Sequence, residues 1–241
     1  MDRLIYPAPL YAFLNMIRRS HDITGSLKGI KILDCAAGGE TPPLGLFHEY
    51  GCETWGIDIS PGAVQLAQTF AEQHQMNLNI RQGDMRHLPF ADATFDCVYE
   101  YNSIAHLSKL DTGIAIQEMH RVLKKGGLCF VGFMSLDCWP ILGRSVNDGE
   151  FCLMEGGEEV THSAYADDEP DQYFGGWQII QKEKHTRWYR RWSEQQSLTD
   201  WMGWYDPQHS DLTSAEWQDL YGGRVAHSNY SHLYYMLEKI E

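Results

Sequence analysis

The stretch K-I-L-D-C-A-A-G-G-E-T-P-P-L-G-L, residues 31–46, decides the fold of this chain. Ile32 and Leu33 form a short apolar run, which is typical of a strand buried on both faces, and Asp34 ends that run. Small residues follow, and Thr41 before two prolines predicts a helix start with Thr41 as its N-cap. A strand, a tight turn of small residues and a helix make the first half of a nucleotide-binding βαβ unit.

The carboxylate of Asp34 indicates which kind of ligand this turn accepts. Small turn residues let a ligand approach the backbone closely, and the start of the helix offers unpaired N–H groups. A pyrophosphate over the turn would be repelled by Asp34, whereas a ligand with a cationic end would be attracted. S-adenosylmethionine, with its amino group and sulfonium, is such a ligand. The lack of a G-x-G-x-x-G pattern argues against the alternative of an NAD(P)-dependent oxidoreductase.

The same stretch resembles motif I of the class I, Rossmann-like methyltransferases, whose usual form is L-D-x-G-x-G-x-G. In that family the acid and the turn hold the methionine part of S-adenosylmethionine, which implies this role for Asp34, Ala36 and Gly38. Ala36 replaces the first glycine of the motif and Glu40 replaces the third, so only Gly38 stays in register. These departures keep a non-catalytic S-adenosylmethionine-binding protein as an alternative, since a fold does not fix a function.

A second acid stands at the end of the next expected strand. Residues 54–58 read T-W-G-I-D, and Asp58 lies at about the distance past the first turn where an acid binds ribose hydroxyls in βαβ nucleotide folds. We therefore expect Asp58 to bind the ribose and Ile59 to pack against the adenine ring. Two acids that each end a strand of one βαβ unit are a stronger signal than either acid alone.

Gly83-Asp84-Met85 follows a third expected strand at residues 78–82 and resembles the adenine-recognition turn of the same family. Residues 84–90 also resemble the D-x-x-x-L-P-F pattern of its small-molecule branch, the UbiE-like methyltransferases of type 11. The resemblance implies that the Asp84 carboxylate accepts from the exocyclic amine of adenine and that the Met85 amide donates to the ring. The alternative is an aspartate that only caps a turn.

A fourth expected strand, residues 95–99, leads into Glu100-Tyr101-Asn102-Ser103. Ligands of this fold class sit beyond the carboxyl ends of the strands, at the switch point between the first and fourth, so we expect Glu100 and Tyr101 near the transferred methyl group. His106 is the candidate general base, because the unperturbed pKa of histidine is near neutrality. Alternatively, His106 only orients the loop. The N-P-P-Y or D-P-P-Y motif of amino-group methyltransferases is missing here, which disfavours nucleobase and glutamine acceptors.

The N-terminal segment carries apolar residues at positions 10, 13, 14 and 17, and this spacing predicts a helix. In the family that the chain resembles, this segment often folds over the cofactor, which implies that Tyr6 and Tyr11 touch it. The alternative is a helix that only packs on the edge of the sheet.

These motifs extend the resemblance over residues 30–134 and imply the fold. We expect an α/β fold with a Rossmann-like, seven-stranded, mostly parallel sheet, helices on both faces and an antiparallel C-terminal hairpin. The apolar pattern predicts helices at 42–50, from 61 and at 111–123, strands at 128–133, 177–189 and 233–237, and a short helix at 168–174 within a loop-rich, acidic segment 135–176.

We expect a single class I methyltransferase domain over residues 1–241, with an aromatic-rich cap inserted at about 195–223. The aromatic residues of this insertion are Trp201, Trp204, Tyr205, Trp217 and Tyr221. Such residues suit a lid or an aromatic cage for a cation. Equally, they suit a homodimer contact or a small local core.

The composition of the chain indicates which classes of partner it can bind. With 241 residues, 43% of them hydrophobic, the chain suits one large domain. A net charge of −14 repels phosphate backbones and anionic lipid, so we expect a small-molecule methyl acceptor and neither nucleic acid nor membrane as a partner. The sequence shows no long apolar run and no signal-peptide pattern, which predicts a cytoplasmic protein.

The six cysteines and eleven histidines show no metal-ligand spacing, so no metal is expected. Cys35, Cys97 and Cys129 fall in expected strands as small core residues.

Overall fold

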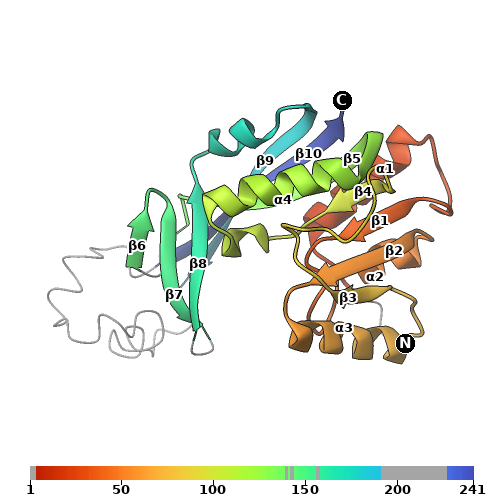
Figure 1. The fold of residues 1–241 in the computed structure, drawn as a ribbon, viewed down its shortest axis with the longest axis horizontal. Helices are drawn as coiled ribbons and strands as arrows, with labels where there is room; N and C mark the ends of the chain where they lie inside the picture. The colour runs from red at the N-terminus through yellow and green to blue at the C-terminus, as the bar shows by residue number, and fades with distance from the viewer. Residues whose placement is uncertain (1–3, 139–140, 142–143, 156–157, 191–226) are drawn as a thin grey trace, which may run out of the picture.

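The computed structural model describes residues 4–138, 141, 144–155, 158–190 and 227–241 (Figure 1). The first five strands run in the order β3-β2-β1-β4-β5, and neighbours in this part of the sheet pair in parallel. Their bounds are β1 (Lys31–Asp34), β2 (Glu53–Asp58), β3 (Ile80–Gln82), β4 (Phe95–Tyr99) and β5 (Leu123–Ser135). This is the Rossmann-like half that the sequence predicts, with its switch point between β1 and β4.

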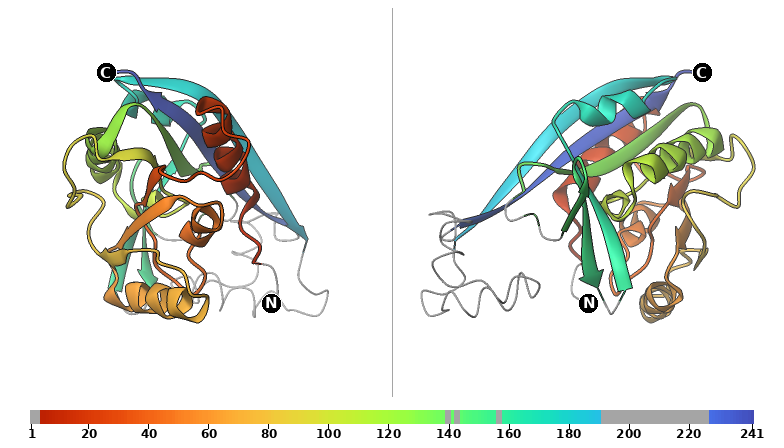
Figure 2. Two further views of the ribbon diagram at one scale, coloured as in Figure 1. Left: turned by 90° about the vertical axis from the view of Figure 1, so that its right-hand side faces the viewer. Right: turned by 60° about the vertical axis from the view of Figure 1, so that its left-hand side comes forward.

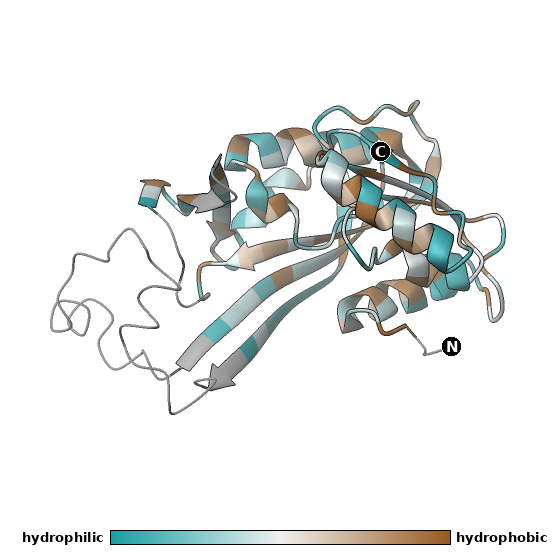
Figure 3. Cartoon of the chain, turned by 90° about the horizontal axis from the view of Figure 1, so that it is seen from below, coloured by the Kyte–Doolittle hydropathy of each residue, from teal (hydrophilic) through white to brown (hydrophobic). Residues whose placement is uncertain are grey.

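Helices cover both faces of this parallel sheet. The large buried apolar residues of α1 (Ala8–Ser20), α2 (Leu44–Glu49) and α3 (Pro61–Gln73) belong to one core cluster, and those of α4 (Lys109–Val122) belong to another. Figure 2 shows α1 and α4 on opposite sides of the strands. Figure 3 shows apolar and hydrophilic residues mixed along the helices, as expected for helices that bury one face. The expected N-terminal helix is confirmed, with Leu10, Phe13, Leu14 and Ile17 buried.

Helix starts follow the sequence in two cases and differ in one. The Ser60 hydroxyl accepts from the Ala63 amide at the start of α3, and Ser108 does the same for Asp111 at the start of α4. The prediction that Thr41 caps α2 is wrong, because that helix begins at Leu44 without a side-chain cap. The position before Leu44 is Pro43, whose side chain has no acceptor, and Thr41 lies two residues further from the helix than a cap does.

The segment after β5 differs most from the expectation. In place of loops, it forms the three strands β6 (Arg144–Asn147), β7 (Glu150–Glu155) and β8 (Glu158–Tyr165), which pair antiparallel in sequence order. Strand β8 then pairs in parallel with the end of β5. The described residues therefore form a ten-stranded sheet, and the expected seven strands are too few. The short helix expected at 168–174 is present as the 3-10 turn η2 (Glu169–Tyr173).

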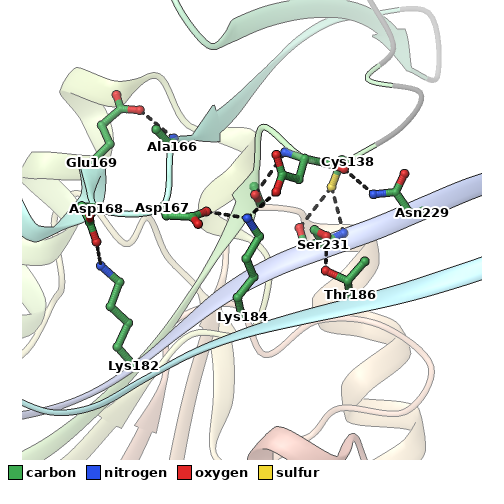
Figure 4. A network of polar contacts seen from close by, with 12 residues as sticks. Cys138, Ala166, Asp167, Asp168, Glu169, Lys182, Lys184, Thr186, Asn229 and Ser231 are labelled. Carbon is green, nitrogen blue, oxygen red and sulfur yellow. Dashed lines mark hydrogen bonds and ion pairs between the residues drawn. The ribbon is translucent and has the colours of Figure 1, made fainter.

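The C-terminal hairpin is confirmed. Strands β9 (Trp177–Arg190) and β10 (His227–Lys239) pair antiparallel, and β10 lies antiparallel on β5. Ion pairs join β9 to the preceding turns, from Lys182 to Asp168 at 2.7 Å and from Lys184 to Asp167 at 2.5 Å (Figure 4). Single ion pairs of this kind contribute little each, but together they fix the hairpin against the body.

The inserted cap predicted at 195–223 lies outside the described residues, so the one-domain organisation stays a prediction. All six cysteines are free, and Cys35, Cys97 and Cys129 are buried as expected. Within the described ranges, no cluster of three or more histidine, cysteine or acidic residues could hold a metal ion. None of the described helices is long and apolar enough to cross a membrane.

Candidate functional site

A cavity of about 490 Å³ lies beyond the carboxyl ends of the parallel strands. Its walls come from the turns after β1, β2 and β3, from the 3-10 turn η1 (Ile104–His106) that follows β4, from the start of α4 and from β8. Six residues that the sequence analysis proposed for the site line it together: Ala36, Asp58, Ile59, Asp84, Met85 and His106. This is the position where doubly wound folds bind their ligands.

Asp58 and the turn after β1 form one unit. The Asp58 carboxylate accepts from the Gly38 amide at 3.0 Å and from the Ser60 amide at 2.9 Å. A methyl group at Gly38 would lie 2.4 Å from Asp58 Oδ2 and 2.5 Å from the Cβ of Ala63. Only glycine therefore lets the second acid come this close to the turn. Gly38 supports the wall of the cavity from behind.

Asp34 lies behind the same turn and is 1% exposed. Its Oδ1 accepts from the Ala36 amide at 3.0 Å, whereas Oδ2 has no hydrogen-bond partner within the described residues. Burial raises the pKa of Asp34 to about 7, against a partly opposing effect of the Tyr99 hydroxyl. The acid that ends β1 is thus buried beside the Tyr99 hydroxyl, and the next two residues, Cys35 and Ala36, line the cavity.

Glu100, directly after β4, is a second fully buried acid. Its Oε2 accepts from the Ile104 amide at 2.5 Å, and its Oε1 has no partner in the described part of the chain. Burial, reinforced by the charge of Asp34, raises the pKa of Glu100 to about 8. Tyr101 points elsewhere, toward the hairpin, where its ring is parallel to that of Tyr234 with centroids 6.1 Å apart. The structure therefore does not bring Glu100 or Tyr101 to the cavity surface.

The expected adenine turn contains a partner that the sequence analysis missed. Arg86 donates to the Asp84 carboxylate from its backbone amide at 2.9 Å and from Nη2 at 2.7 Å, and its Nη1 reaches Asp111 at 3.1 Å. The Arg86 guanidinium lowers the pKa of Asp84. All three residues line the cavity. An arginine two positions after the aspartate was the available signal, whereas Asp111 becomes a neighbour only through the fold.

His106 lines the cavity on the side formed by β8. The His106 ring lies edge-on to the ring of His162 on β8, with centroids 4.6 Å apart. Residues 159–161 of β8 complete this wall. The sequence analysis missed them because their segment was expected to be a loop. Ile59, by contrast, is 61% exposed at the cavity, as expected for an apolar side chain that awaits a ligand ring.

The two N-terminal tyrosines lie away from the cavity. Tyr6 is 4% exposed in the core beside α2, with its hydroxyl close to Gly45. Tyr11 packs partly buried against the same cluster. Their placement matches the alternative of a helix packed on the sheet.

We compared the sequence and the fold with those of known proteins. Residues 33–131 match the model of a methyltransferase domain. The match makes the segment 33–131 similar to methyltransferase domains. A methyltransferase domain of this fold implies S-adenosylmethionine as the cofactor.

Two curated relatives illustrate the match. A ubiquinone/menaquinone biosynthesis C-methyltransferase from Haemophilus ducreyi is 34% identical over 115 residues, which cover 46% of this chain and 43% of that protein. A sterol 24-C-methyltransferase from Gibberella zeae is 33% identical over 111 residues, which cover 45% of this chain and 28% of that protein. The chain thus spans less than half the length of the curated relatives it matches.

A solved structure supports the fold. The S-adenosylmethionine-dependent methyltransferase from Methanosarcina mazei superposes with a TM-score of 0.62, covering 98% of this chain and 99% of that one. Its sequence identity to this chain is 15%, so the similarity shows the fold alone.

The residues of this methyltransferase domain fit its cofactor. Asp34 holds a buried carboxylate oxygen without a hydrogen bond to any residue that the structure describes, which suits an ammonium group. Asp58, Asp84 and Asp111 give the cavity wall a negative charge that one arginine, Arg86, only partly offsets. A cation is therefore favoured over a diphosphate at this place.

Proposed function

We propose that this protein transfers the methyl group of S-adenosylmethionine to a small-molecule acceptor. The observation that carries the proposal is the single cavity that gathers Ala36, Asp58, Ile59, Asp84 and Met85 at the strand ends. Asp58 would hold the ribose, Ile59 and Met85 the adenine, and Asp34 the amino group of the methionine part. Asp84 would accept from adenine while it stays paired with Arg86.

Methyl transfer requires little of the protein beyond aligning the acceptor with the methyl group. When bound, the cofactor supplies a methyl group on a positively charged sulfur, which is already a good electrophile. The protein's part is to orient the acceptor and exclude water, which can supply much of the rate. His106 is placed to take a proton if the acceptor carries one.

A small acceptor is supported by two features. The net charge of −14 disfavours a nucleic acid. The relatives named for quinone and sterol methylation act on small molecules by those names. A cytoplasmic location belongs to the same proposal and rests on the sequence pattern, as does a homodimer contact through the inserted segment.

Titration calorimetry tests the proposal. S-adenosylmethionine and S-adenosylhomocysteine should bind, and NAD should not, because the cavity wall is acidic where a diphosphate would lie. A screen over metabolite pools that detects released S-adenosylhomocysteine then separates an enzyme from a non-catalytic binding protein. Binding of NAD without S-adenosylmethionine would overturn the proposal.

A further inference from the structure

The loop that carries the expected adenine contacts is held by α4 at its second half. Residues 83–94, all of them described, connect β3 to β4 without a helix or a regular strand, and we name them the β3–β4 loop. Asp84 and Met85, near its start, line the cavity. A loop holds a ligand contact in place only as firmly as the surrounding scaffold fixes the loop. The contacts of its other residues therefore bear on the cofactor site.

Arg121, in the last turn of α4, uses all five of its side-chain N–H groups. Its Nη1 donates to the carbonyl oxygen of Phe90 at 2.8 Å, and its Nη2 donates to that of Leu88 at 2.9 Å. The other bonds go to carboxylates, from Nε and Nη2 to Glu118 at 2.7 and 2.8 Å and from Nη1 to Asp92 at 2.8 Å. One side chain of α4 thus binds the loop at positions 88, 90 and 92.

Glu118 completes this clamp from the same helix. Its Oε2 accepts from the backbone amide of Leu88 at 2.8 Å and also from Arg121. The hydrogen bonds from Arg121 lower the pKa of Glu118, so the carboxylate is charged near pH 7. Leu88 is 4% exposed and belongs to the same apolar cluster as Met119 of α4. Glu118 and Arg121 therefore fix both the N–H and the carbonyl group of one buried loop residue.

The clamp lies close to Asp84 along the chain. The His87 amide donates to the Asp84 carbonyl oxygen at 3.0 Å, and Leu88 is the next residue. Arg86 joins the Asp84 carboxylate to Asp111 in the first turn of α4, at 2.7 and 3.1 Å. The first half of the loop is thus tied to the first turn of α4 and the second half to its last turn.

We propose that Arg121 and Glu118 are positioning residues that set the recognition of adenine through the β3–β4 loop. Neither is among the described residues that line the cavity, so they act through the backbone of Leu88 on the place of Asp84. With the clamp intact, the Asp84 carboxylate is held where it accepts from the exocyclic amine of adenine. A displacement of about 1 Å is enough to lose much of the effect of such a contact. The inference rests on the proposed S-adenosylmethionine site and adds the residues that set its base specificity.

Calorimetry with two ligands tests the inference on the full chain. S-adenosylhomocysteine carries the exocyclic amine and S-inosylhomocysteine has an oxygen in its place, so the ratio of their affinities reports the Asp84 contact. The wild type should prefer S-adenosylhomocysteine by about ten-fold. Arg121→Lys keeps the charge but cannot reproduce the five bonds, and it should lower this ratio toward one. A variant that only unfolds more readily would lose binding of both ligands equally and keep the ratio.

Further variants separate positioning from a general loss of structure. Arg19→Lys, the same exchange in the last turn of α1, should keep the wild-type ratio. Glu118→Ala should lower the ratio, and Glu118→Gln, which keeps an acceptor for the Leu88 amide, should restore part of it. Adding Arg121→Lys to Asp84→Ala should leave the ratio of Asp84→Ala unchanged, because both changes remove the same contact.

The inference is overturned if the wild type binds both ligands equally well, or if Arg121→Lys lowers the ratio further in the Asp84→Ala background. It is also overturned if Arg121→Lys keeps the wild-type ratio, and the two Glu118 variants decide in the same way if Arg121→Lys does not fold. Binding of S-adenosylhomocysteine with an unchanged ratio in these variants would leave the methyltransferase proposal standing, whereas a wild type that does not bind it would overturn both.

Discussion

At the scale of single residues, the two acids that end β1 and β2 are in different states. Asp58 faces the cavity with both oxygens held by backbone amides. Asp34 is buried behind the turn with one oxygen unpaired among the described residues. Asp58 is thus preorganised to accept from a neutral hydroxyl group. Asp34 suits a cationic group, because the attraction to a cation would offset the desolvation cost of its buried carboxylate.

We expect Asp58→Ala to weaken binding of S-adenosylhomocysteine far more than His106→Ala does, because only Asp58 is placed to bind the ribose. Removing a hydrogen-bonding carboxylate should cost about ten-fold or more in affinity. Asp58→Asn, which keeps one acceptor oxygen, should fall in between. Calorimetry measures all three, and equal losses at Asp58 and His106 would show that the assigned site geometry is wrong.

The raised pKa values of Asp34 and Glu100 make stability depend on pH in a defined direction. Both acids have ordinary values near 4 and folded values of about 7 and 8, so the folded chain binds more protons between those limits. Their contribution to the unfolding free energy therefore falls as pH rises from about 4 to about 8, and is constant above. Asp34→Asn and Glu100→Gln remove the titration.

Denaturant unfolding of the wild type and the two amide variants measures this effect. Relative to each variant, the wild type should lose stability as pH rises through the window from about 4 to about 8. Affinity for S-adenosylmethionine should rise over the same window, because its ammonium group pairs with ionised Asp34. A stability difference that stays flat with pH would contradict the assignment of these buried acids.

At the scale of elements, the tight turn between β1 and α2 depends on one glycine. Gly38→Ala should destabilise the fold by about 1–3 kcal/mol and weaken cofactor binding, because the new methyl group overlaps Asp58. Gly175→Ala is the matched control, since nothing lies within 4 Å of its added methyl group. Urea unfolding compares the two, and equal stability of both variants would mean that the turn tolerates a side chain.

The sequence predicts local elements better than paired ones. Strand β4 has the expected bounds, and β1 ends at Asp34 as expected, because a short apolar run followed by an acid is a local signal. Among strands β6 to β8, β6 has only four residues, all of them exposed, and β8 is rich in polar residues. Their formation depends on pairing with each other and with β5, which no local pattern encodes.

At the scale of the whole molecule, the fold decides which predicted site residues meet. The parallel sheet brings Asp58 at the end of β2, Asp84 after β3 and His106 after β4 to one cavity, as the switch-point rule predicts. Glu100 and Tyr101 do not face that cavity, because Glu100 is fully buried and the Tyr101 ring packs toward Tyr234 of the hairpin. Arg86 and residues 159–161 join the site through side-chain reach and long-range pairing, which a sequence pattern does not show.

The most direct measurement is a crystal structure of the protein soaked with S-adenosylmethionine. It should show the ligand in the large cavity, with the ribose on Asp58, the adenine between Ile59 and Asp84, and the amino group toward Asp34. Density for the ligand at another place, or a diphosphate compound bound there in its stead, would contradict the claim that acids at the ends of β1 and β2 select a cationic adenosyl compound.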